Sequence, residues 1–130
     1  MERFLSKYSP YLYAILRTLA GLIFAMHGTQ KLFGWPGGNP TVPLASLMGV
    51  AGLIECIGGL MITFGILTSY AAFIASGEMA AAYFKAHAPH SALPIVNHGE
   101  LAVLYCFLFL YMAAQGSGLW SIGAGTRRKT

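Results

Sequence analysis

The chain has 130 residues, enough for one domain, and 56% of them are hydrophobic while only 9% are charged. A soluble globular protein carries about 25% charged residues, so this composition disfavours a soluble domain and favours a small polytopic membrane protein. Although the formal net charge is +4, the basic residues do not form a basic stripe or groove. No nucleic-acid partner is therefore expected, and the expected surroundings are the lipid bilayer.

Four apolar stretches are each long enough to cross a bilayer, which takes roughly 20 mainly apolar residues. They cover residues 11–33, 44–67, 70–88 and 97–120. Glycine, proline and short polar residues, which break helices, dominate the connections between them. The sequence therefore predicts an all-α, integral membrane four-helix bundle of the multi-pass type, with residues 1–130 in a single domain.

Basic residues outside the stretches indicate the orientation, because Lys and Arg beside spanning helices stay on the cytoplasmic side. Arg3 and Lys7 precede the first stretch, and residues 127–129, which are Arg-Arg-Lys, follow the fourth. Both the N and C termini are therefore predicted to be cytoplasmic. A cleaved signal peptide is the alternative interpretation of the first stretch, but Arg17 interrupts what would be its apolar core.

Ionisable residues inside the stretches are the most informative feature of the sequence. Three of the four acidic residues, Glu55, Glu78 and Glu100, lie in the second, third and fourth stretches. A charge at the centre of a membrane helix costs roughly 2.5 to 3.5 kcal/mol on insertion scales, so such groups normally turn inward and pair. The basic residues available inside the stretches are Arg17, Lys31 and Lys85.

The positions of these residues along the stretches predict one polar pocket. If each helical residue advances about 1.5 Å from the start of its stretch, Glu55 and Glu78 fall near the middle of the membrane. A larger set falls toward the outer side, comprising His27, Lys31, Lys85, His87, His98 and Glu100. We therefore expect a buried polar pocket in the outer half of the bundle, with Arg17 and Lys85 as counter-ions of the two central carboxylates.

Each polar group also has a structural interpretation that the sequence leaves open. Asn97 and Glu100 have the spacing of a capping box at a helix start, and lysines near helix ends can extend to the interface. A histidine on an apolar face is more often an interior residue than a ligand. Cys56 and Cys106 stand alone without ligand spacing, so no metal site is expected.

Five segments follow one another in a distinctive order. They are Arg17 to Gly34 with His27-Gly28 and Lys31, Glu55-Cys-Ile-Gly-Gly59, Glu78-Met-Ala-Ala-Ala-Tyr83-Phe84, Asn97-His-Gly-Glu100, and Gly116-Ser-Gly118-Leu-Trp-Ser121. Together they resemble the DoxX family. The family is described as small four-helix bacterial inner-membrane proteins, named for subunits that accompany a terminal quinol oxidase and a thiosulfate–quinone oxidoreductase. Many members have no assigned activity. His98 stands where the family usually has glycine.

The resemblance implies a multi-pass protein of the bacterial inner (plasma) membrane that works in, or supports, a quinone-linked redox system. The implied cofactor is a quinone, with none bound covalently, and the implied partners are other redox proteins; a homo-oligomer is left open. The candidate pocket or quinone-binding residues are Arg17, His27, Lys31, Glu55, Glu78, Lys85 and Glu100. Catalytic residues cannot be assigned from the sequence.

The chain lacks sequence motifs for an electron carrier of its own. It has no cysteine cluster for iron–sulfur and no C-x-x-C-H for covalent haem, which favours an accessory subunit over a complete enzyme. Two alternatives stay open. One is a small proton-coupled transporter that uses an embedded carboxylate, and the other is a membrane scaffold for partner proteins whose buried charges fix helix pairing.

Overall fold

The computed structural model describes residues 1–123, which form helices and no strand. The first helical run joins α1 (Glu2–Leu5), the 3₁₀ turn η1 (Ser6–Tyr8) and α2 (Ser9–Phe33). The second run joins α3 (Leu47–Leu53), the π-helical turn η2 (Ile54–Gly58) and α4 (Gly59–Phe64). The third run joins α5 (Thr68–Ala82) and the π-helical turn η3 (Tyr83–His87). The short helix α6 (Pro94–Asn97) and the long helix α7 (Glu100–Gln115) follow. The prediction of an all-α chain is confirmed for this part of the protein.

The long helical runs overlap the predicted spans, with one clear difference. Two of the runs, Glu2–Phe33 and Leu47–Phe64, are long and apolar enough to cross a membrane. The prediction for 97–120 is wrong at its C-terminal end, because α7 stops at Gln115 and residues 116–123 follow without helix. Gly116 and Gly118 adopt positive φ angles of 81° and 67° there, which favours glycine and does not continue a helix. The basic residues Arg127, Arg128 and Lys129 lie outside the described residues.

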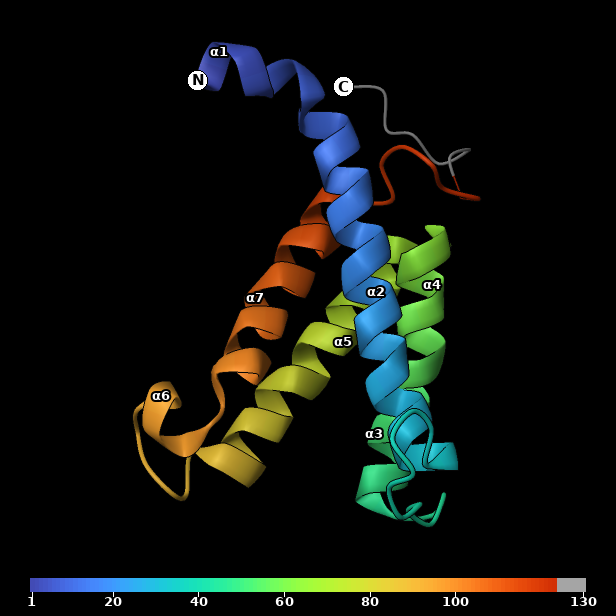
Figure 1. Ribbon diagram of the computed structural model, residues 1–130, viewed down its shortest axis with the longest axis vertical. Helices are drawn as coiled ribbons and strands as arrows, with labels where there is room; N and C mark the ends of the chain where they lie inside the picture. Colours follow the sequence, from blue (N-terminus) through green and yellow to red (C-terminus); the bar gives the residue numbers. More distant parts are fainter. Residues whose placement is uncertain (124–130) are drawn as a thin grey trace.

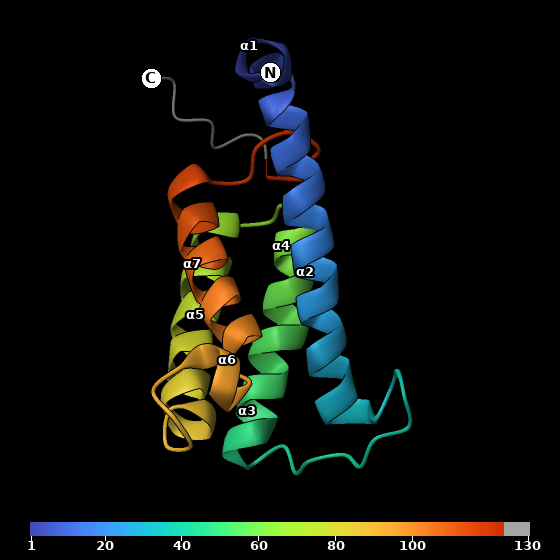
Figure 2. The same cartoon turned by 60° about the vertical axis from the view of Figure 1, so that its left-hand side comes forward.

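The helices form two antiparallel hairpins (Figure 1). In the first hairpin α2 packs along α3, η2 and α4, and in the second α5 packs along α7. The N-terminus and residues 116–123 lie at one end of the molecule, and the 34–46 and 88–99 connections lie at the other (Figures 1 and 2). We call these the terminal end and the loop end. In Figure 1 the second hairpin leans away from the first toward the loop end.

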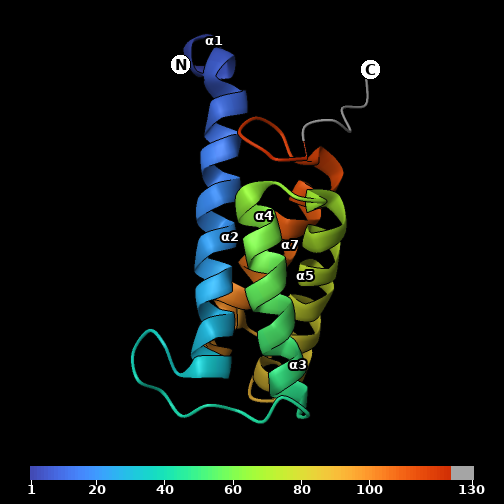
Figure 3. The ribbon, with the colours of Figure 1, turned by 90° about the vertical axis from the view of Figure 1, so that its right-hand side faces the viewer.

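The first hairpin is held together by close backbone contact. A Cβ placed on Gly21 would come within 2.6 Å of the Thr63 backbone nitrogen, and one on Gly59 within 2.5 Å of the Ala25 nitrogen. A Cβ on Gly28 would overlap the backbone of Cys56. Small residues permit such approach between membrane helices. The side-by-side course of α2 and α3–α4 in Figure 3 follows from these glycines.

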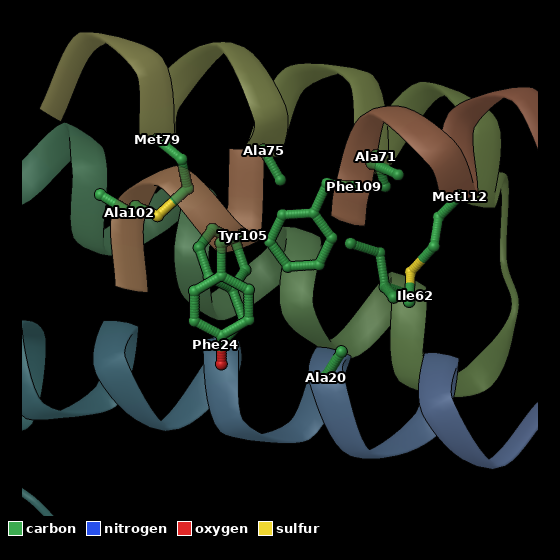
Figure 4. Packing of buried hydrophobic residues seen from close by; sticks show 11 residues of the cluster. Ala20, Phe24, Ile62, Ala71, Ala75, Met79, Ala102, Tyr105, Phe109 and Met112 are labelled. Atoms are coloured by element: carbon green, nitrogen blue, oxygen red, sulfur yellow. The ribbon is translucent and has the colours of Figure 1, made fainter. Parts of the chain in front are cut away.

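Apolar side chains of both hairpins meet in a core near the middle of the bundle (Figure 4). Phe24 of α2 packs edge-on against Phe109 of α7, with ring centroids 4.7 Å apart, and Ile62 of α4 is also fully buried. The buried face of α5 is made of small side chains, chiefly Ala71, Ala72 and Ala75. Aromatic rings therefore fill the space between the hairpins.

Candidate functional site

A cavity of about 550 Å³ lies between the two hairpins, toward the loop end. Residues of α2, α3, η2, α5, η3 and α7 line it, together with His98. The polar lining side chains are His27, Lys31, Glu55, Glu78, Lys85, His87, His98 and Tyr105, and the other lining side chains are apolar. Five of the seven candidate residues therefore face one cavity, whereas Arg17 and Glu100 do not line it. A role of any of the seven residues in binding a ligand stays a prediction.

Lys31 and Glu55 form an ion pair in the wall of this cavity. The Lys31 Nζ atom donates to Glu55 Oε1 at 2.5 Å, and the Glu55 side chain is only 2% exposed. The contact of Gly28 with Cys56 brings α2 and η2 together one turn before Lys31. Glu55 belongs to the π-helical turn η2, a feature that occurs frequently at functional sites. Close helix packing thus selects Lys31 as the partner of Glu55.

Glu78 faces the same cavity from α5. Its Oε2 atom is buried and has no hydrogen-bond partner among residues 1–123, and the same holds for Oε2 of Glu55. Within that range Lys31–Glu55 is the only ion pair. Buried polar atoms are normally hydrogen-bonded. Two carboxylate oxygens of cavity-lining residues thus have no hydrogen-bond partner within the described chain.

Aromatic residues form the inner wall of the cavity. Tyr105 of α7 is 6% exposed and stacks on Phe109, with ring centroids 5.1 Å apart. The ring centroids of Phe24 and His27 lie 5.6 Å and 6.4 Å from that of Tyr105. Figure 4 shows Tyr105 reaching across from α7 toward α2. Its hydroxyl makes no hydrogen bond within the described chain. Tyr105 is not among the residues predicted from the sequence, because a tyrosine in an apolar helix carries no charge signal.

Three basic or titratable side chains lie at the mouth of the cavity. Lys85 and His98 are exposed, and His87 is half-buried. His87 Nδ1 lies 3.0 Å from the Asn97 carbonyl oxygen, and the Asn97 amide donates to the Tyr83 hydroxyl and to the Ser91 carbonyl. Asn97 therefore ties the 88–99 connection to η3, and the connection contributes His98 to the rim of the cavity.

The expectation that Arg17 and Lys85 are the counter-ions of the two central carboxylates is wrong, because neither forms an ion pair within residues 1–123. The Arg17 side chain is fully buried and contacts residues 117–120 at the terminal end of the bundle. The guanidinium donates to the carbonyl oxygens of Ser117, Leu119 at 3.1 Å and Trp120 at 2.9 Å. Backbone carbonyls carry partial negative charge and can satisfy a buried cation. Arg17 therefore anchors residues 116–121 to the helices.

The chain is similar to known proteins over most of its length. The DoxX family model matches residues 12–88. A protein from Haemophilus influenzae, described as uncharacterized, is 45% identical over 121 residues, which cover 88% of this chain and 90% of that protein. The chain belongs to the DoxX family. No solved structure matches the chain significantly.

The part matched to the DoxX family holds most of the cavity. His27, Lys31, Glu55, Glu78 and Lys85 all fall within residues 12–88. The DoxX family is a membrane family, and the chain exposes many large apolar side chains. They include Leu19 at 53%, Phe73 at 64% and Phe107 at 66% exposure. Such surfaces are unfavourable in water and suit a lipid environment.

The Asn-His-Gly-Glu segment, which lies beyond the DoxX match, differs from the expected capping box. Gly99 precedes α7 in place of Asn97, and Glu100 is the first helical residue and is exposed. The Asn97 side chain accepts from the Gly99 N–H at 2.8 Å. A tight chain bend at His98, where φ is 59°, brings this histidine to the cavity. Glu100 is therefore a helix-start residue, and Asn97 supports the rim.

Proposed function

We propose that this DoxX-family protein is a subunit or accessory protein of a quinone-linked redox system, and that its cavity accepts a quinone headgroup. The observation that carries the proposal is the cavity itself. Its walls are mostly apolar, and two of its lining residues, Glu55 and Glu78, each have a buried Oε2 atom with no hydrogen-bond partner in residues 1–123. Ligand sites commonly combine an apolar lining with a few placed polar groups.

In this proposal the protein is a multi-pass bacterial inner-membrane protein with four spans and cytoplasmic termini. The helical runs that support this topology are 2–33, 47–64, 68–87 and 100–115. Arg3 belongs to α1 and Lys7 to η1. The N-terminal end of the first helical run lies at the terminal end (Figure 1), which would face the cytoplasm by the positive-inside rule. The loop end and the cavity mouth would then face the outer side of the membrane.

The cavity could be entered by a lipid-soluble ligand from the bilayer. α5 packs against η2 and α4 but much less against α3. Leu47 and Val50 on α3 and Ile74 on α5 line the cavity and are also well exposed. In a bilayer these side chains would contact acyl chains. A quinone headgroup could then enter between α3 and α5 while its isoprenoid tail stays in lipid.

The polar groups suit the two chemical needs of a quinone site. A bound quinone supplies two-electron redox chemistry that is coupled to proton uptake or release. His27 and the Tyr105 hydroxyl can donate hydrogen bonds to its carbonyl oxygens. Glu78, whose Oε2 has no partner in the described chain, is placed to hold or release a proton, while Glu55 is already paired with Lys31 by direct contact.

The proposal predicts that quinone remains bound during gentle purification and that filling the cavity removes it. Ala82 lines the cavity, whereas Ala114 is exposed on α7. Ala82→Leu should lower the quinone retained per protein by about tenfold, equivalent to about 1.4 kcal/mol, and Ala114→Leu should not. Mass spectrometry of lipid extracts measures the retained quinone. Equal retention by both variants, or none by the wild type, would contradict the proposal.

Proton-coupled transport is the second candidate, and Glu78 favours it. A proton-coupled exporter needs an embedded carboxylate that is free to protonate, and Glu78 has no cationic partner among residues 1–123. Proteoliposomes with an imposed pH gradient separate the two candidates. Solute flux that depends on the gradient and is lost in Glu78→Gln, from protein that retains no quinone, would support the transporter.

A further inference from the structure

The cavity and the terminal end of the bundle are separated by closely packed side chains. Phe24, Ile62, Phe109 and Met112 have no exposed surface, and the aromatic pair lies in contact at 4.7 Å. Figure 4 shows these side chains filling the space between the helices. An interior packed in this way excludes water. This layer, which we call the apolar barrier, blocks the route from the cavity toward the terminal end.

Arg17 and the segment that it binds close the terminal end itself. Residues 116–121 cross this end, held by the Arg17 contacts and by Tyr13, whose hydroxyl donates to the Gly116 carbonyl at 2.7 Å. A second, smaller pocket of about 190 Å³ lies beside this segment. It shares no lining residue with the cavity. The cavity and this second pocket are therefore separate.

At the loop end, in contrast, residues that line the cavity are exposed. Lys85 and His98 line the cavity and are exposed at the same time. They carry or can carry charge, and a charged side chain is stable only where water or a partner reaches it. Lys31 is 24% exposed although its partner Glu55 is buried. A chain of polar groups thus runs from the two carboxylates to the surface at the loop end.

From this asymmetry we infer that the cavity exchanges protons and small polar solutes with water only at the loop end. The inference rests on the proposed function, because it states how that same site would exchange protons. Any proton taken up or released in the cavity is then coupled to the aqueous phase on the loop side of the membrane. With cytoplasmic termini, this is the outer side.

Single-cysteine labelling in membranes tests this access without any quinone. The native Cys56 and Cys106 are replaced by alanine, and one cysteine is introduced at Ala82 in the cavity. Ser6→Cys and Ala92→Cys mark the terminal and loop sides, because both positions are exposed. Ala20→Cys, at a buried core position, is the matched control beyond the cavity. A membrane-impermeant maleimide is applied to vesicles of each orientation.

We expect the cysteine at position 82 to react only in the vesicle orientation in which the cysteine at position 92 reacts, and the cysteine at position 20 to react in neither. Ala51→Cys, on the opposite wall of the cavity, should give the same pattern and replaces the first variant if that one does not accumulate. Reaction of both cavity cysteines from the terminal side, from both sides, or from neither side would overturn the inference. The result is independent of quinone retention, so failure of the proposed function would be seen separately.

Discussion

Replacement of Arg17 by methionine is expected to lower the free energy of unfolding by about 3 kcal/mol, because it removes several hydrogen bonds from a charged donor, each worth about 1.5 to 3 kcal/mol. The three carbonyls of residues 117, 119 and 120 would lose their charged donor. Buried acceptors without partners are costly. Residues 116–123 should then detach from the helices. Unfolding in mixed micelles of rising SDS fraction measures the stability loss, and limited proteolysis detects the released segment.

Two comparisons make this experiment specific. Lys7→Met removes a basic residue that is exposed, and it should leave stability within about 0.5 kcal/mol of the wild type. Arg17→Lys keeps the charge, but an ammonium lacks the planar fork of a guanidinium that reaches several carbonyls at once. It should fall between the wild type and Arg17→Met. A stable Arg17→Met variant with a protected C-terminal segment would disprove the anchoring role.

Lys31→Met is expected to have the second large effect, because it leaves Glu55 buried without its cation. Breaking a buried pair by removing one partner costs about 3 kcal/mol or more, whereas replacing both partners by apolar residues of similar size is often neutral. The double variant Lys31→Met with Glu55→Leu should therefore recover most of the stability lost by Lys31→Met alone. Denaturation of Lys31→Met, Glu55→Leu and the double variant in mixed micelles measures the coupling between the two positions.

The matched control for this pair is Lys85→Met. Lys85 lines the same cavity but is exposed and makes no ion pair with the described residues. It should therefore cost little stability. If Lys85→Met destabilised the protein as strongly as Lys31→Met, or if the double variant were no better than the single one, the ion pair would not be the reason for the effect.

The sequence was sufficient to predict the helical class and the inward position of the central carboxylates. The high cost of a charge in hydrocarbon made an interior position of Glu55 and Glu78 the expected outcome, and both line one cavity. The partner of Glu55 could not be predicted, since it depends on the register between α2 and η2. That register follows from the contacts of Gly21, Gly28 and Gly59.

Arg17 shows a second limit of sequence reasoning. Helical phase places Arg17 within about an 80° arc of His27 and Lys31, yet Arg17 and Lys31 are separated by about 21 Å along the axis at 1.5 Å per residue. A carboxylate was the expected partner of Arg17, whereas its observed partners are backbone carbonyls. The two glycines at positions 116 and 118 were the available signal, because they end α7 early and expose those carbonyls.

The most direct test of the central claim, that the embedded carboxylates face one cavity that binds quinone, is photolabelling in native membranes. A photoreactive quinone analogue would be activated and its adducts located by mass spectrometry. We predict adducts confined to peptides that span 24–31, 47–55, 74–87 and 98–105, and their loss when excess natural quinone competes. Adducts scattered over lipid-facing residues such as Leu19, Phe73 and Phe107, unaffected by competition, would contradict the account.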